Sequence, residues 1–257
     1  MHHLLAFEFP PLGELIVWKD LFGTHGWYGL NKVGLECLLA TVLTLVIFLM
    51  AGRRGALVPT GVQNVAEMVV DFIRDGIILQ TMGPEGLGWG MFFTTLFMFI
   101  FFCNIFEIVP GIQMPATARM GIPLVLALIA WVCYHVTGIK HQGVLAYFKS
   151  ATIPPGVPLA MLWLVFFIEL LQILVLRPFS LAVRLFANML AGHLLLVTFA
   201  VLTKTVLHPN PLALVTPLTI AMEIAIAGFE ILVSLLQAFI FTILTAVYIG
   251  GAMHPEH

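Results

Sequence analysis

The sequence predicts an all-α integral membrane protein with about five membrane-embedded helices, one amphipathic surface helix and a long tilted hairpin formed by the last two helices. Of its 257 residues, 61% are hydrophobic and only 9% are charged. Soluble globular domains usually carry about 25% charged residues, so this chain cannot cover a water-exposed surface. Its 11 lysines and arginines against 13 acidic residues leave no basic stripe for nucleic acid. We therefore expect a single membrane domain over residues 1–257 that contacts the lipid bilayer and binds no nucleic acid.

Five apolar runs supply the membrane-embedded helices, because one crossing of the hydrocarbon core needs roughly 20 residues. They cover about residues 33–51, 88–109, 120–137, 158–203 and 212–250. The last two runs are each about twice the length of one crossing, and the final run contains no polar turn. We interpret them as two long tilted helices with a kink at Pro178. They form a hairpin over residues 158–250 with its turn at 208–211.

Residues 60–80 have the pattern of an amphipathic helix at the membrane surface. Apolar side chains recur at helical spacing on one face, while Gln63, Glu67 and Asp71 lie on another. Thr60 followed by Gln63 predicts a capping box at the start of this helix. Because helices that bind anionic lipid are basic, we expect this acidic face to meet solvent or a protein partner.

Polar and ionisable side chains are concentrated in the last two apolar runs. A charge at membrane depth costs roughly 2.5–3.5 kcal/mol, so such residues indicate function. The first of these runs contains Glu169, Gln172, Arg177, Arg184, Asn188 and His193, and the second contains Glu223, Glu230 and Gln237. The three in the second run are seven residues apart, which places them on one helix face.

The spacing also predicts which of these residues face one another. In an antiparallel hairpin around 208–211, facing residues have a nearly constant sum of residue numbers. Arg184 with Gln237 and His193 with Glu230 have nearly the same sum, at twice the centre of the turn. A single register therefore places both pairs along one polar seam.

The composition of this seam is that of a proton path interrupted by a fixed positive charge. Histidine and glutamate take up and release protons near neutral pH when their surroundings are tuned. Arg184 stays charged and favours ionisation of a nearby carboxyl group. The structural alternatives are an interhelical tie for Arg184, a static buried pair for His193 and Glu230, and a non-essential position at the mouth of the path for Glu223.

Other candidate residues have simpler interpretations. Arg177 beside Pro178 can be a structural partner of backbone or acidic groups, and Glu107 can be a solvated helix end. His135 is expected to be a packed histidine rather than a haem ligand. No spacing of cysteine and histidine indicates a metal site, and we expect no cofactor.

Four motifs resemble subunit a in the membrane (Fo) sector of bacterial F-type ATP synthases. The two long and specific motifs are RPFSLAVRLFANMLAGH at 177–193 and EILVSLLQAFIFTILTAVY at 230–248. PTGVQN at 59–64 and NIFEIVP at 104–110 support them. Together the motifs extend over most of residues 59–249.

The resemblance implies a non-catalytic stator subunit that conducts protons through two half-channels to and from a carboxyl group on the rotor ring. Proton flow would thereby be coupled to rotation, and nucleotide chemistry would belong to partner subunits. Arg184 would be the proton gate. The outer half-channel would be lined by Glu107, Asn188, His193, Glu223, Glu230 and Gln237. The inner half-channel would lie near Glu169 and Gln172.

The resemblance also implies partners and orientation. The partners would be the c-subunit ring, the peripheral-stalk b subunits and the remainder of the ATP synthase complex. The chain would cross the bacterial plasma membrane several times, with residues 1–32 outside and the C-terminus in the cytoplasm. His193 argues for protons over sodium ions. The alternatives are a self-contained proton-coupled transporter, for which no internal repeat is seen, and a cofactor-binding respiratory subunit.

Overall fold

The computed structural model describes residues 31–54, 59–109, 112, 114–153, 158, 161–207 and 215–253. Most of the predicted external segment 1–32 and the predicted turn at 208–211 lie outside the described residues. Within the described ranges every regular element is helical, as expected for an all-α protein.

Five helical stretches are long and apolar enough to cross a membrane. They are Lys32–Arg53, Pro84–Ile105, Gly121–Gln142, Leu162–Val206 and Thr216–Met253. Each of them corresponds to one predicted apolar run, so the class of fold is confirmed. The elements that form them are α2 (Lys32–Arg54), η2 (Pro84–Trp89) with α5 (Gly90–Ile105), α6 (Gly121–Gln142), α8 (Leu162–Leu171) with η5 (Gln172–Leu176) and α9 (Arg177–Val206), and α10 (Thr216–Met253).

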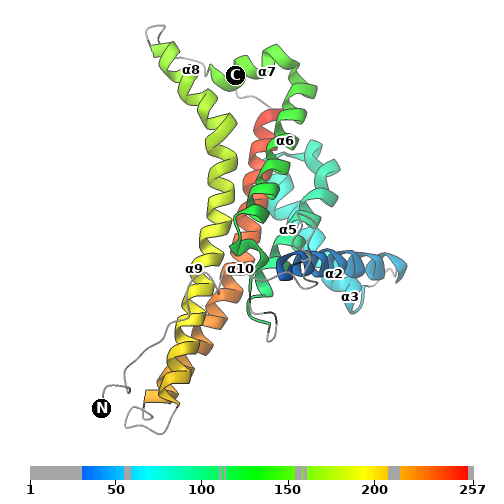
Figure 1. The fold of residues 1–257 in the computed structure, drawn as a ribbon. Coiled ribbons are helices and arrows are strands. Elements are labelled where there is room, and N and C mark those ends of the chain that lie inside the picture. The colour runs from blue at the N-terminus through cyan, green and yellow to red at the C-terminus, as the bar shows by residue number, and fades with distance from the viewer. Residues whose placement is uncertain are drawn as a thin grey trace.

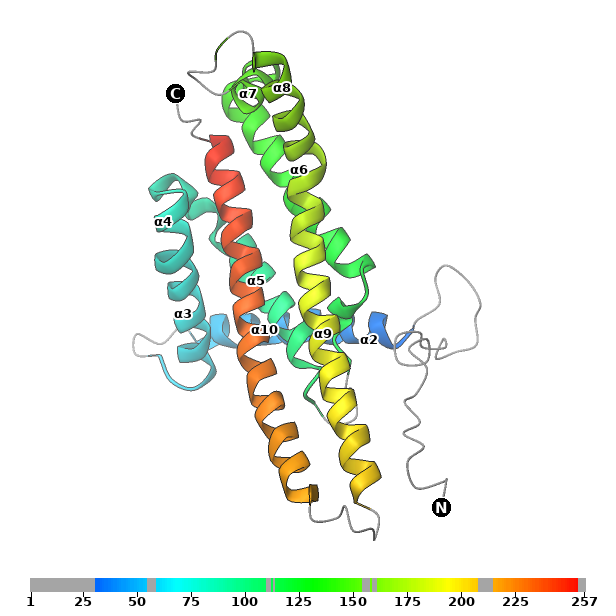
Figure 2. The same cartoon turned by 90° about the vertical axis from the view of Figure 1, so that its left-hand side faces the viewer.

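The last two stretches form the long hairpin that positions the candidate site. Helices α9 and α10 are in contact and run side by side, while α2 lies crosswise to them in both views (Figures 1 and 2). At 1.5 Å per residue, α2 is about 35 Å long, close to the thickness of the hydrocarbon core, whereas α10 is about 57 Å long. If α2 crosses along the membrane normal, the hairpin is steeply inclined.

An irregular turn precedes Pro178 in the first arm of the hairpin. The segment Gln172–Leu176 (η5) is π-helical, and Pro178 occupies the second position of α9. Proline has no N–H group, and its ring clashes with the carbonyl group four residues earlier in a regular helix. The wider π turn accommodates this clash, so Leu162–Val206 continues as one helical stretch.

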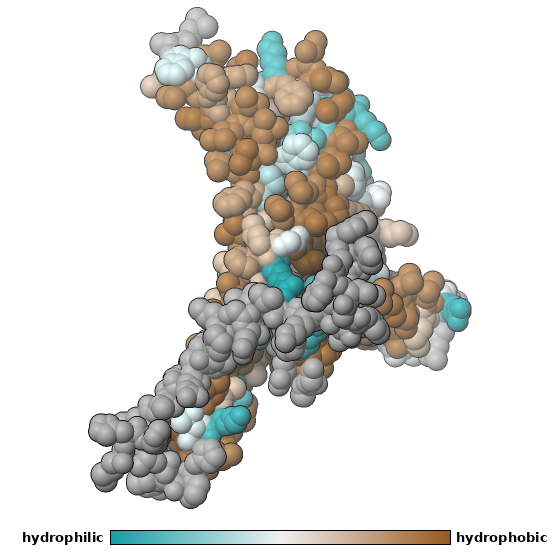
Figure 3. All heavy atoms as spheres, viewed as in Figure 1, coloured by the Kyte–Doolittle hydropathy of each residue, from teal (hydrophilic) through white to brown (hydrophobic). Residues whose placement is uncertain are grey.

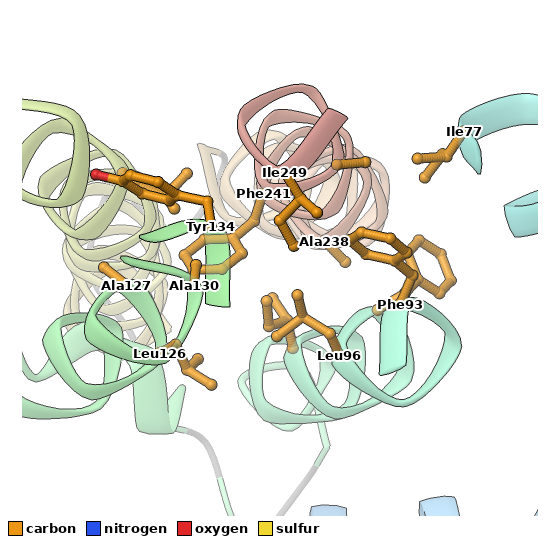
Figure 4. Packing of buried hydrophobic residues seen from close by; sticks show 14 of the residues in the cluster. Ile77, Phe93, Leu96, Leu126, Ala127, Ala130, Tyr134, Ala238, Phe241 and Ile249 are labelled. Atoms are coloured by element: carbon orange, nitrogen blue, oxygen red, sulfur yellow. The ribbon is translucent and has the colours of Figure 1, made fainter. Parts of the chain in front are cut away.

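The core lies where α5, α6, α9 and α10 meet. Figure 4 shows side chains from α5, α6 and α10 in this cluster, among them Leu96, Tyr134 and Phe241. Outside the core, hydrophobic side chains cover most of the described part of the face drawn in Figure 3. Because lipid is as apolar as these side chains, close packing rather than exclusion of water holds such helices together.

The predicted surface helix consists of α3 (Val62–Ile73), η1 (Arg74–Ile78) and α4 (Leu79–Thr81), beside α10 in Figure 2. The predicted capping box is wrong. Gly61, with φ of 61°, is the N-cap, and no side chain caps the helix. Gln63 was predicted on the polar face but is buried, and its Nε2 donates to Glu67 Oε1 at 2.8 Å.

The chain stays helical beyond residue 137, where the predicted apolar run ends. Helix α6 continues to Gln142, and α7 (Val144–Thr152) follows directly. Gly143 has φ of 82°, a conformation that glycine adopts without strain, and it reverses the chain between the two helices. The ring of Tyr147 then lies against Gly138, where no side chain would fit.

Candidate functional site

The interface between α9 and α10 brings two amide side chains together. Asn188 Nδ2 donates a hydrogen bond to Gln237 Oε1 at 2.7 Å. Gln237 is 1% exposed, and its Nε2 has no hydrogen-bond partner among the described residues. Ser234, one turn earlier on α10, is also buried, and its hydroxyl group has no hydrogen-bond partner within the described ranges. These free donors and acceptors form a polar surface inside an apolar helix pair.

Two turns before Gln237 on α10, the carboxyl group of Glu230 lies directly against the backbone of Gly192. A β-carbon at Gly192 would overlap both carboxyl oxygens, so only glycine allows this approach. Glu230 is 2% exposed, and its Oε2 accepts no hydrogen bond from a described residue. The two contacts between α9 and α10 follow the predicted antiparallel register within about one turn. That small shift places Asn188, rather than Arg184, against Gln237.

His193 contacts a carboxyl group from a third helical stretch. Its Nδ1 lies 3.6 Å from Oε1 of Glu107, just after α5, and both side chains are buried. Burial raises the pKa of Glu107, and the contact with His193 lowers it in part. No hydrogen bond or ion pair among the described residues joins His193 to Glu230. Adjacent helix positions point about 100° apart, so when Gly192 faces α10 its neighbour His193 faces elsewhere.

Arg184 lies on the outer face of the hairpin. It is exposed, together with Ser180, Ala187, Asn188 and Ala191, which recur at helical spacing along α9. Among the described residues Arg184 has no hydrogen bond or ion pair. Small residues around a charged side chain allow the surface of a neighbouring helix to approach closely.

A second polar region lies at the other end of the hairpin, near α7 and α8 at the top of Figure 1. It is a cavity of about 370 Å³ whose lining includes Glu169, Arg177, Gln142 and Tyr248. The guanidinium group of Arg177 lies 5.3 Å from the centre of the Tyr248 ring. Burial raises the pKa of Tyr147, another lining residue, so its hydroxyl group stays neutral at physiological pH.

Two predicted site residues lie apart from these groups. Gln172 is half-buried in the π turn and is not among the residues that line the cavity. Glu223 is half-buried two turns before Glu230 on α10. His135 is packed, as expected, with its ring near those of Trp131 and Tyr134.

Some polar residues of the site were not recognised in the sequence. The hydroxyl group of Thr117 donates to Asn104 Oδ1 inside the protein, and Asn104 Nδ2 has no partner among the described residues. Asn104 precedes Glu107 by three residues, about one helical turn, so their spacing could have linked them. Thr117 offered no such signal, because only the fold brings it to the end of α5.

The fold and site define a helical membrane protein in which buried titratable and amide groups line the contacts of a tilted hairpin. Residues 35–250 match the family described as ATP synthase A chain. ATP synthase subunit a of Frankia alni is 42% identical over 250 residues, which cover 93% of this chain and 86% of that protein. The subunit a of Rhodococcus erythropolis is 41% identical over 234 residues, covering 90% of this chain and 85% of that protein.

A third relative, ATP synthase subunit a of a Nocardioides species, is 35% identical over 256 residues, covering 98% of this chain and 92% of that protein. The chain therefore belongs to the ATP synthase A chain family. It is a membrane subunit of the ATP synthase complex that takes part in proton translocation.

Proposed function

We propose that this chain is the stator subunit that conducts protons through two offset half-channels to and from a carboxyl group on a ring of c subunits. The observation that carries this proposal is the separation of two polar regions along one hairpin. Arg184 lies between them, about 10 Å of helix from Arg177 and about 14 Å from His193. Neither region continues past Arg184 along α9, which is the arrangement expected of two half-channels that meet at a moving partner.

The outer half-channel runs through Glu107, His193 and Glu230. The contact between Glu107 and His193 supports this assignment, since imidazole and carboxyl groups in contact can exchange a proton. The carboxyl group of Glu230 at Gly192 continues the path, and the amide pair of Asn188 and Gln237 leads it toward Arg184. Glu223 lies nearer the mouth of this half-channel.

Arg184 is the electrostatic gate. Its guanidinium group keeps its charge at every physiological pH, so it favours the ionised form of a ring carboxyl group that comes close. The same charge repels a proton that would pass directly from one half-channel to the other. The exposed, small-residue stripe around Arg184 gives the ring access to it.

The inner half-channel begins at the cavity beside Glu169 and Arg177. A carboxyl group at a polar cavity can accept the proton that leaves the ring, and Gln172, three residues further on, extends this region. A membrane potential drives the transfer with about 2.3 kcal/mol per charge per 100 mV.

The partners and orientation follow from the same assignment. The ring packs on the exposed face of the hairpin, and the peripheral-stalk b subunits and the nucleotide-binding subunits complete the complex. The N-terminus lies outside the bacterial plasma membrane and the C-terminus lies in the cytoplasm. The motif at 177–193 and the acidic face of α3 support this arrangement.

Replacement of Arg184 tests the gate. In membrane vesicles that contain the whole complex, Arg184→Ala should abolish ATP synthesis and ATP-driven proton pumping, because the ring carboxyl group is no longer forced to ionise. The variant should also open a passive proton leak, measured by the decay of an imposed pH gradient. Arg53→Ala, at an exposed arginine near the end of α2, is the control and should leave both rates unchanged. Normal coupled synthesis in an assembled Arg184→Ala complex would contradict the proposal.

A further inference from the structure

A buried carboxyl group on α2 has no part in the path described so far. Glu36 is 1% exposed, and neither of its oxygens accepts a hydrogen bond from a described residue. Its neighbours at helical spacing, Val33 and Ala40, are buried in a small cluster with Cys103 and Phe106 of the α5 end. Glu36 therefore lies on the side of α2 that faces protein.

The opposite side of α2 makes this position unusual. Leu35, Leu38, Val42 and Leu45 are all exposed, as expected of a helix surface in lipid. The helix thus places apolar side chains toward lipid and a carboxyl group against its protein neighbours. Burial of an ionised carboxyl group without hydrogen bonds is unfavourable, so Glu36 is stable here only if it binds a proton or interacts with nearby cations.

Two basic residues and two thiol groups lie near Glu36. Lys32 on α2 and Arg119 after the short helix η3 (Ala116–Ala118) are close enough for their charges to act on it. The thiol groups of Cys37 and Cys103 are in hydrogen-bonding contact beside it. Lys32 is the first residue of α2, four positions before Glu36, and no further charged residue follows Glu36 on this helix before Arg53.

The end of α5 connects the neighbourhood of Glu36 to Glu107. Cys103, beside Glu36, is followed by Asn104, whose Oδ1 accepts the hydrogen bond from Thr117 and whose Nδ2 has no partner in the part of the chain that the structure describes. Glu107 follows one turn later and contacts His193. Buried polar groups therefore lie along one turn of chain at the end of α5, between the neighbourhood of Glu36 and the carboxyl group of Glu107.

We propose that Glu36 is a further proton-accepting residue of the outer half-channel, upstream of Glu107. This inference rests on the proposed function, because it extends the path proposed there toward the surface. Glu36 takes up a proton at the end of the channel where Lys32 and Arg119 lie. Glu107 is the next group that binds the proton, and the polar side chains of Asn104 and Thr117 line the route between the two carboxyl groups.

The test uses the complete ATP synthase complex reconstituted in vesicles, with ATP synthesis measured against the pH of the compartment that supplies protons. Glu36→Gln should lower the rate roughly tenfold and flatten its dependence on that pH, because the amide cannot carry the proton. Glu36→Asp should retain most of the rate and shift the pH of half-maximal synthesis. Glu85→Gln, at an exposed acid on η2, is the matched control and should change neither quantity.

An unchanged rate and pH profile in assembled Glu36→Gln complexes would overturn the inference. So would an equal loss in both Glu36 variants at every pH, because a purely structural role moves the rate without moving the midpoint. If Glu36→Gln complexes fail to assemble, the pH of half-maximal synthesis in Glu36→Asp decides: a shift supports the inference, and an unchanged value overturns it. The variant Glu107→Gln separates the two proposals. A normal rate of ATP synthesis in Glu107→Gln would contradict the proposed outer half-channel. A normal rate in Glu36→Gln, with a lowered rate in Glu107→Gln, would contradict only the proposed role of Glu36.

Discussion

At Gly192 the backbone of α9 touches the carboxyl group of Glu230, and this contact decides where a titratable group lies inside the hairpin. The carboxyl group is held in place by the absence of a side chain rather than by hydrogen bonds, since its Oε2 has none from the described residues. An unpaired buried carboxyl group changes its proton occupancy at a lower cost than one held by an ion pair. The position is thus suited to transient binding of a proton.

Gly192→Ala should lower ATP synthesis severalfold with little change in the stability of the complex. The added methyl group displaces the end of the flexible Glu230 side chain, which can move but then leaves the path. Combining it with Glu230→Asp, which is one methylene group shorter, should restore part of the rate. Gly228→Ala is the control, since a β-carbon there meets nothing within 4 Å. Equal rates in Gly192→Ala and Gly228→Ala would show that the close contact has no role in transport.

Among the helical elements, the contact of α4 with α10 fixes the surface segment to the hairpin. Phe72 of α3 contributes through ring contacts with Phe97 of α5 and Phe239 of α10, at centroid distances of 5.9 and 5.6 Å. At the end of α10, Gly250 lies against the backbone of Thr81. Here the neighbour is a carbonyl group, which cannot rotate away as a side chain can.

Gly250→Ala should therefore destabilise the protein by about 1–3 kcal/mol, the usual cost of overpacking a tight contact. The new β-carbon would lie 2.7 Å from the carbonyl oxygen of Thr81. The loss should be seen as a lower temperature of thermal unfolding of the purified complex in detergent. The neighbouring substitution Gly251→Ala is an internal control, because a β-carbon there meets nothing within 4 Å. Matching unfolding temperatures for the two variants would refute this contact.

At the scale of the whole molecule, a basic residue and an acidic surface are exposed on different elements. The hairpin exposes Arg184 on one side, while α3 exposes Asp71 beside Arg74, with Nη1 and Oδ1 3.1 Å apart. Asp75 also pairs with Arg74, at 2.8 Å, and Glu67 is exposed one turn before Asp71. Two of these three acids pair with the single arginine, so this surface is net negative and suited to a basic partner.

Glu67→Lys combined with Asp71→Lys should weaken the attachment of a neighbouring subunit of the complex, because the surface becomes positive. The measurement is the amount of each subunit that remains with this chain after detergent extraction. Glu67→Gln with Asp71→Asn should have a smaller effect, because it removes the negative charges without adding positive ones. If neither variant alters the subunit composition, the acidic face is only solvated.

Properties that depend on the local pattern were predictable from the sequence. Five apolar runs become five long helical stretches because the length of a run and its hydropathy suffice for membrane embedding. The antiparallel register of α9 and α10 was close to its predicted value, since residues seven apart on a helix share a face. The chain's membership of the ATP synthase A chain family agrees with the resemblance of its long motifs.

Contacts between segments distant in the sequence were decided only by the tertiary structure. His193 pairs with Glu107 rather than Glu230 because α5 approaches the hairpin from another side, a contact that spacing within two helices cannot reveal. The sequence did not single out Glu36 within the first apolar run, because only the folded structure places it beside Cys103. Helical periodicity assigns a side chain to a face, but the partner on that face depends on how the helices pack in three dimensions.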